Sequence, residues 1–151
     1  KLSEDIVVFF RSQGCVVVST VEADGSIHNS CKGIVDINTD GRIYLLDLYT
    51  GKTFRNLKKN PNISITAFDE HKFTGYCLKG KADIIERDGL DSDVIISWEK
   101  EITNRVTRRL IKNIRGEKGH HRHPEALLPK PKYMIVMNVE EIVDLKPGHL
   151  D

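Results

Sequence analysis

A basic turn near the middle of the chain carries residue types that bind phosphate. An apolar stretch beginning at Tyr44 runs into Thr50-Gly51-Lys52-Thr53, and a short basic segment follows as far as Asn60-Pro61. If that segment is a helix, its N-terminus offers free backbone N–H groups and a favourable dipole, and the turn adds hydroxyls and an ammonium. The alternative is an ordinary capping or left-handed turn with Lys52 in solvent. The turn is not a P-loop, because that motif needs an earlier glycine where this chain has Leu46.

Two later segments also hold groups that could do chemistry. Residues 119–123 read Gly-His-His-Arg-His, and their imidazoles could bind a transition metal or donate a proton near a ligand. Because no carboxylate or cysteine ligand is assured nearby, we expect a loop and no metal site. The second segment is a basic stripe, typical of nucleic-acid binding or of a solvated helix face. Aromatic residues that would stack on bases are missing there, which favours the solvated face and no nucleic-acid partner. The stripe comprises Arg105, Arg108, Arg109, Lys112 and Arg115.

The three cysteines indicate a reducing compartment. Their number is odd and they form no Cys-x-x-Cys pair, which argues against a disulfide framework or a zinc site. We expect Cys15 and Cys77 to be small buried residues. Cys31 lies beside Lys32 in the sequence and could be near a ligand.

Composition limits the class of protein. The chain has 151 residues, of which 39% are hydrophobic and 30% charged, and this suits one folded domain, 1–151. A formal net charge of +1 gives no overall field toward nucleic acid or an anionic membrane. The apolar runs are too short to span a bilayer, and the charged N-terminal segment does not resemble a signal peptide. We therefore expect a cytoplasmic protein without a membrane partner.

Hydrophobic periodicity predicts the order of the elements. A helix capped by Ser3 and ended by Gly14 comes first, and Asp24-Gly25 makes a hairpin turn between the first two strands. Gly80 is expected to mark a bulge or bend in the fifth strand. The predicted strands are 15–22, 27–37, 43–48, 62–68, 75–86 and 133–139, and the later helices are 52–59 and 90–115, with a loop at 116–132.

This order predicts a mainly β fold, a small antiparallel β-barrel with peripheral helices. Many short strands joined by hairpins close their edges most simply in a barrel. A doubly wound sheet is disfavoured, because its strands would alternate with crossover helices.

Several short motifs, in this order and at these spacings, resemble the flavin-binding split barrels related to pyridoxamine 5′-phosphate oxidase. The resemblance covers Val16 to Glu86, about half the chain. The motifs are Asn29-Ser-Cys-Lys-Gly33, Asp40-Gly41, a strand ending in Asp47, Gly51-Lys52-Thr53, Asn56-Leu57, Asn60-Pro61 and Leu78-Lys-Gly-Lys-Ala82.

The resemblance implies a homodimer with one flavin mononucleotide (FMN) in each of two clefts at the subunit interface. It places the flavin phosphate on Lys52 and Thr53. It also implies that Asn29, Ser30, Cys31, Lys32 and Gly33 run along the ribityl chain and ring, and that Leu46 and Asp47 close the site. Lys32 is either a second cation for the phosphate or an outward, solvated lysine.

The chain departs from the oxidases that give this family its name. Those enzymes carry an arginine near the position of Cys31 and a Thr-Asn pair near Asp47. Their C-terminal tryptophan and Arg-x-His elements are not recognisable, since the only tryptophan is Trp98. The resemblance therefore favours the uncharacterised flavin-nucleotide-binding branch over vitamin B6 oxidation.

Two classes of function fit these residues. The first is an FMN-dependent oxidoreductase acting on a small-molecule redox substrate, in which the flavin carries the electron chemistry. The second is a non-enzymatic module that stores or senses a flavin or serves as an interaction scaffold. Similar barrels use a deazaflavin or bind haem, which leaves a further alternative for the ligand.

Overall fold

The computed structural model describes residues 1–47, 51–116 and 133–150, and its elements follow the predicted order. The bounds predicted for the second strand and for the helix after Gly51 are confirmed. In chain order the elements are α1 (Glu4–Arg11), β1 (Val16–Val21), β2 (Ile27–Ile37), β3 (Arg42–Leu46), α2 (Lys52–Lys59), β4 (Asn62–Asp69), β5 (Thr74–Glu86), η1 (Arg87–Gly89), α3 (Ser92–Ile114), β6 (Tyr133–Asp144) and η3 (Gly148–Leu150).

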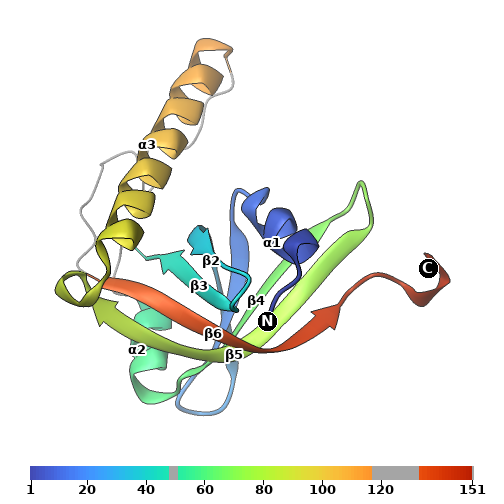
Figure 1. Cartoon of the computed structure of the whole chain (residues 1–151). Helices are drawn as coiled ribbons and strands as arrows, with labels where there is room; N and C mark the ends of the chain where they lie inside the picture. Colours follow the sequence, from blue (N-terminus) through green and yellow to red (C-terminus); the bar gives the residue numbers. More distant parts are fainter. Residues whose placement is uncertain (48–50, 117–132, 151) are drawn as a thin grey trace.

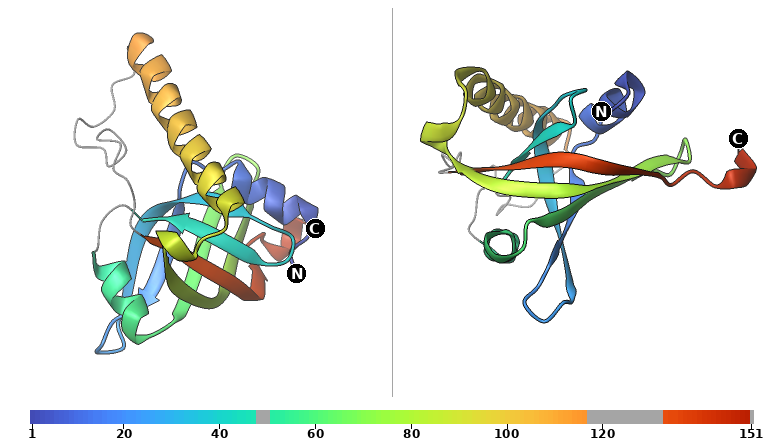
Figure 2. Two further views of the ribbon diagram at one scale, coloured as in Figure 1. Left: turned by 60° about the vertical axis from the view of Figure 1, so that its left-hand side comes forward. Right: turned by 60° about the horizontal axis from the view of Figure 1, so that its bottom comes forward.

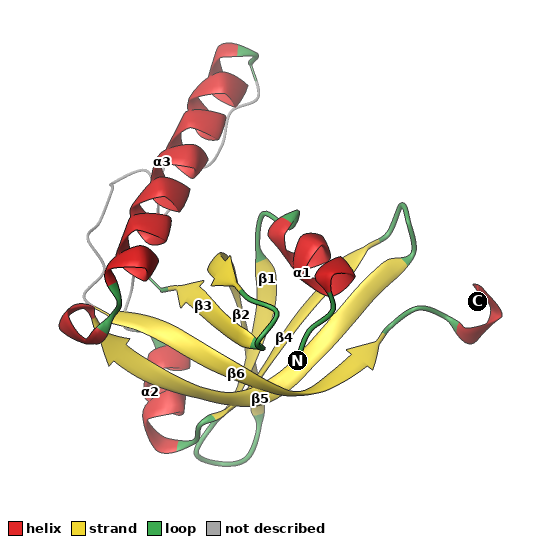
Figure 3. Ribbon diagram, in the orientation of Figure 1, coloured by secondary structure: helices red, strands yellow, loops and turns green. Residues whose placement is uncertain are grey.

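The strands form a closed antiparallel barrel in the order β1-β2-β3-β6-β5-β4 (Figure 1). Closure depends on β6, which pairs with β3 on one side and with β5 on the other. The helices lie at the periphery of this barrel (Figure 3). The predicted fold class, a small antiparallel barrel with peripheral helices, is confirmed.

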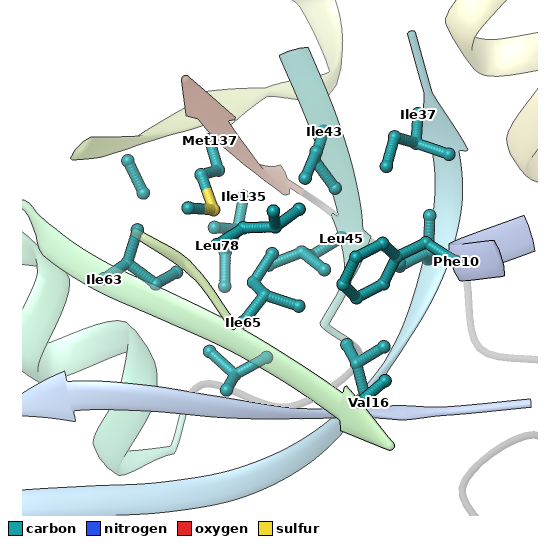
Figure 4. Close-up of a cluster of buried hydrophobic side chains, with 14 of the residues drawn as sticks. Phe10, Val16, Ile37, Ile43, Leu45, Ile63, Ile65, Leu78, Ile135 and Met137 are labelled. Carbon is teal, nitrogen blue, oxygen red and sulfur yellow. The ribbon is translucent and has the colours of Figure 1, made fainter. Parts of the chain in front are cut away.

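Aliphatic side chains fill the inside of the barrel. They alternate with outward residues along each strand, as in β1, where Val16 and Val18 are buried and Val17 is exposed. Burying one such side chain stabilises the fold by about 1.5–3 kcal/mol, so this core holds the strands that carry the site. Its largest members include Phe10, Ile37, Ile43, Leu45, Ile65, Leu78, Ile135 and Met137 (Figure 4).

Helices α1 and α2 both pack against this core, on opposite sides of the barrel (Figure 2). The Ser3 hydroxyl caps α1 by accepting a hydrogen bond from the backbone N–H of Ile6, as predicted. The helix ends with Ser12 as its C-cap, two residues before the predicted stop at Gly14. From α2, Leu57 enters the core and Phe54 packs beside it, which agrees with the helical spacing of the two residues.

Helix α3 packs on the outside of the barrel against β2, β3 and β6. Its residues Val94, Trp98 and Ile102 form a second buried cluster with side chains of β2, β3 and β6, among them Val35 and Met134. The far half of the helix projects away from the barrel (Figure 1). No helix in the described part of the chain is both long and apolar enough to cross a membrane.

Two expectations were wrong. Strand β6 does not stop at residue 139 but pairs with β5 as far as Asp144, because a bulge lets the ladder continue. Cys15 and Cys77 are not buried: Cys15 is exposed just before β1, and Cys77 is half-buried on the outward side of β5, between the core residues Tyr76 and Leu78. The predicted irregularity at Gly80 is confirmed, since the register shifts between Lys79 and Gly80.

Candidate functional site

The first turn of α2 presents the groups expected at a phosphate site. Gly51 is the N-cap in an extended conformation, with φ −97° and ψ −157°, and makes no side-chain cap. Gly51 is therefore not left-handed, and of the two turns that were the alternative to a phosphate site only the capping turn agrees with this geometry. Thr53 is buried, and its hydroxyl lies 2.8 Å from that of Ser30 on β2. Two hydroxyls and a helix N-terminus thus meet at one place, where an anion is favoured.

The ammonium of Lys52 is already engaged by a carboxylate. Lys52 Nζ lies 2.7 Å from Oε1 of Glu22, at the end of the β1–β2 hairpin. The Lys52 side chain is 52% exposed, so solvent screens this pair and a stronger anion can compete for the lysine. The Lys52 contact and then the hydrogen bond from Ser26 hold the pKa of Glu22 below its usual range.

Lys32 bonds to Asp47 rather than to the α2 turn. Its Nζ donates to Oδ1 of Asp47 at 2.9 Å, and the phenol of Tyr133 donates to Oδ2 of the same carboxylate at 2.6 Å. Asp47 is only 2% exposed. A buried carboxylate needs such partners, because an unpaired charge in the interior is costly. The charge of Lys32 is therefore compensated inside the protein, unlike that of a solvated outward lysine.

The residues on β2 divide between the two faces of the strand. Ser30 and Lys32 lie on the inward side, and their contacts hold both ends of the connection from β3 to α2, at Thr53 and at Asp47. Asn29 and Cys31 lie on the opposite face. Both are exposed, and Asn29 accepts a hydrogen bond of 2.6 Å from Ser19 of β1. The five residues 29–33 therefore do not all lie on one surface of this chain.

Gly33 and Leu46 pair with each other in the β2–β3 ladder. The Leu46 side chain is buried in the cluster beneath α3, so it contributes to packing, and the backbone is the part it can offer to a ligand. Gly33 is also buried. The structure thus brings Ser30 and Thr53 together beside Lys52. It sets Lys32 and Asp47 next to them as a separate pair, in which the carboxylate is buried and the lysine is half-buried.

Two residues of this region were not foreseen from the sequence. The sequence pattern places Glu22 at the end of the first strand and Tyr133 at the start of the last one, and in the structure both bond to candidate residues. A further contact supports α2, since the Asn56 amide donates to the buried Thr20 hydroxyl at 3.1 Å. Strand pairing and barrel closure create these contacts across long sequence separations, so local patterns carried no signal for them.

The other candidate features fall mostly outside the part of the chain that the structure describes. The histidine segment 119–123 lies outside the described residues, as do the side chains of most of the basic stripe. Within the described ranges, no three His, Cys, Asp or Glu side chains group in a way that could hold a metal ion. A cavity of about 290 Å³ between α1, β2 and α3 is lined by none of the candidate site residues.

The tyrosine beside Asp47 should make stability fall at alkaline pH. Burial, and then the bond to Asp47, raise the pKa of Tyr133 far above its usual range. A raised pKa gives stability that is fully present below the unfolded-state value of about 10 and is lost as the pH rises above it. We expect Tyr133→Phe to cost about 1 kcal/mol at pH 7 and to cost less above about pH 10.

Urea unfolding at a series of pH values measures this difference. Tyr76→Phe, in the aromatic cluster with Phe9 and Phe10, is the matched control for the loss of a tyrosine hydroxyl elsewhere in the barrel. If the cost of Tyr133→Phe stayed constant from neutral to alkaline pH, the phenol would not be the group responsible.

Comparisons with known proteins agree on the fold. The family model described as pyridoxamine 5′-phosphate oxidase matches residues 2–143. HupZ of Group A Streptococcus is 19% identical with a TM-score of 0.66, over 98% of this chain and 97% of that one. A putative pyridoxamine 5′-phosphate oxidase of Lactobacillus delbrueckii is 19% identical with a TM-score of 0.60, over 95% and 93%. HutZ, described as the haem storage protein of Vibrio cholerae, is 19% identical with a TM-score of 0.55, over 95% and 94%. None of the curated proteins searched matches the chain.

Proposed function

The chain belongs to the pyridoxamine 5′-phosphate oxidase family, and from that premise we propose that it is a cytoplasmic FMN-binding flavoprotein that acts as an oxidoreductase. The flavin would supply the electron and hydride chemistry. The residues of this chain would bind its phosphate, orient it and exclude water.

The observation that carries this proposal is the cluster at the start of α2. A phosphate dianion is held best by a cation, hydroxyl donors and helix N–H groups together. Lys52, Thr53 and Ser30 supply these at one end of the barrel, with the two hydroxyls 2.8 Å apart. Because Asp47 already compensates Lys32, Lys52 is the cation of this set that the phosphate would take.

The proposal includes a homodimer with the flavin at the interface. The outward face of β1 and β2 presents exposed apolar side chains, Val17 and Ile27, next to Asn29 and Cys31. Residues 29–33 point to two faces, so a ligand lying along this strand would need a second surface to cover the outward ones. A partner subunit placed against this face would supply that surface.

The substrate is a small molecule other than the pyridoxamine phosphate of the oxidases that name the family. This chain has Cys31 near the position at which those enzymes carry an arginine, and the acidic Asp47 near their Thr-Asn pair. Asp47 is buried and neutralised by Lys32, so it does not replace an exposed polar contact to substrate.

The visible absorption spectrum of the protein tests the proposal. It should be recorded after purification without added cofactor, and again after FMN is added and the free flavin removed. Flavin bands retained at about one per chain would support the proposal. A Soret band without flavin bands would instead indicate haem, and no retained chromophore would favour a scaffold. Steady-state oxidation of a reduced nicotinamide by the loaded protein would distinguish an enzyme from a storage or sensing module.

Lys52→Ala should weaken FMN binding. Loss of one charge-assisted contact to the phosphate is expected to cost about 1.5–3 kcal/mol of binding free energy. Lys59→Ala is the matched control, because it removes the same charge from the last turn of the same helix. Fluorescence titration with FMN measures both variants. Equal affinities for the wild type and Lys52→Ala would refute the assignment of the phosphate to α2.

A further inference from the structure

The phosphate site proposed above already holds a negatively charged group from the chain itself. Helix α2 has no acidic residue in its first turn and no side-chain cap at Gly51. The carboxylate that meets Lys52 comes instead from Glu22, 30 positions earlier in the sequence, at a distance of 2.7 Å. A carboxylate on this lysine stands in for the oxygen atoms of a phosphate, since both are anions that accept from an ammonium.

The β1–β2 hairpin orients this carboxylate. The backbone N–H of Glu22 donates to the carbonyl of Ser26 at 2.8 Å, and the Ser26 hydroxyl lies 3.1 Å from Oε2 of Glu22. One carboxylate oxygen therefore faces the hairpin and the other faces Lys52. When Lys52 leaves, Glu22 keeps the Ser26 hydroxyl as a partner and remains exposed enough to be hydrated, so release of the lysine is not opposed by a buried, unpaired charge.

We propose that Glu22 competes with the phosphate of the ligand for Lys52. The phosphate must displace the Glu22 carboxylate from Lys52 in order to bind. The inference rests on the proposed function, because it concerns the same phosphate site. A phosphate dianion that also reaches Thr53 and the helix N-terminus displaces Glu22, whereas a singly charged anion or a flavin without a phosphate gains little from doing so. Glu22 thereby lowers the affinity of the site for phosphate-bearing ligands, whereas a flavin without a phosphate does not meet this competition.

Binding of FMN and of riboflavin to the full chain tests this role. Glu22→Gln keeps the size of the side chain and one acceptor oxygen but cannot form the ion pair with Lys52. We expect FMN to bind about threefold to fivefold more tightly to this variant, because an exposed ion pair is worth less than a factor of ten. Riboflavin, which has no phosphate, should bind the variant and the wild type equally. Quenching of flavin fluorescence measures all four affinities.

Asp24→Asn is the matched control. It removes the same charge from the same hairpin, but Asp24 bonds to Ser26 and not to Lys52. An equal gain in FMN affinity in Asp24→Asn would show a general charge effect and overturn the proposal. Glu22→Gln should also give no gain in a Lys52→Ala background, since the lysine that it frees is absent; a gain there would overturn the proposal as well.

The two proposals fail in distinguishable ways. If the wild type binds FMN, Lys52→Ala weakens binding and Glu22→Gln changes nothing, the phosphate site stands and the role of Glu22 is refuted. If neither the wild type nor Glu22→Gln binds FMN, the proposed function is refuted and the role of Glu22 with it. Thermal unfolding of each variant confirms that the exposed substitution leaves the fold intact.

Discussion

Asp47→Ala is expected to lower the free energy of unfolding by about 3 kcal/mol. Asp47 is 2% exposed and accepts hydrogen bonds from Lys32 and Tyr133. Its removal leaves an ammonium and a phenol at the end of the barrel without their shared acceptor, and breaking a buried ion pair in this way costs about 3–5 kcal/mol. We expect a cost at the lower end of this range because the Lys32 side chain is 18% exposed and can regain some hydration.

Urea unfolding at neutral pH measures this effect. Asp83→Ala, an exposed carboxylate on β5, is the matched control and should change stability by less than about 0.5 kcal/mol. The double variant Asp47→Ala with Lys32→Met should be more stable than the sum of the single changes predicts, because it removes both charges of the pair. An Asp47→Ala variant as stable as the wild type would contradict the assigned pairing.

The sequence was sufficient to predict the parts of the fold that depend on local patterns. The turn residues on either side, Asp24-Gly25 and Asp40-Gly41, gave β2 its bounds, and the break at Asn60-Pro61 marked the end of α2. The Ser3 cap follows from the hydroxyl of its side chain, and the irregularity at Gly80 follows from the absence of one. Both are local properties of the sequence. The order of elements then limited the fold to a barrel.

The contacts of the candidate site depend on the closed barrel, so local sequence patterns could not predict them. Tyr133 reaches Asp47 from 86 positions away because β6 is the strand that closes the barrel. Lys32 looked available to a phosphate because the sequence does not show which face of β2 turns toward the buried end of β3. The contact of Glu22 with Lys52 needs both the hairpin and α2 in place. A resemblance to a family indicates which residues lie at the ligand site in its members. It does not show which of these charged side chains form ion pairs with other residues of this chain.

The same limit explains the error at β6. Beyond residue 139 the strand carries Glu140 and Glu141, which broke the apolar pattern and suggested that the strand had ended. In the structure, Gly80 pairs with Val139 and Lys79 with Glu141, so Glu140 is an extra residue on β6. The bulge shifts the alternation, and Ile142 then lies opposite the buried Leu78.

Gly80→Ala should therefore be among the most destabilising single substitutions in this barrel, with an expected cost of about 3 kcal/mol. A Cβ at Gly80 would lie 1.9 Å from the carbonyl oxygen of Asn138 and 3.1 Å from the Cα of Val139. Both are backbone atoms, so no side-chain rotation can relieve the overlap and β6 itself must move. Since β6 carries Tyr133 to Asp47, that movement should also weaken the bond that supports the candidate site.

Gly14→Ala is the control for the loss of glycine flexibility alone, because an added Cβ there meets nothing within 4 Å. It should be neutral or stabilising by up to about 1 kcal/mol. Urea unfolding compares the two variants, and hydrogen exchange of the β5–β6 amides locates the disturbance. A Gly80→Ala variant as stable as Gly14→Ala, with β5–β6 protection unchanged, would contradict the close approach of the two strands at the bulge. A loss of protection confined to β5 and β6 would show that the ladder closing the barrel depends on the missing side chain at this position.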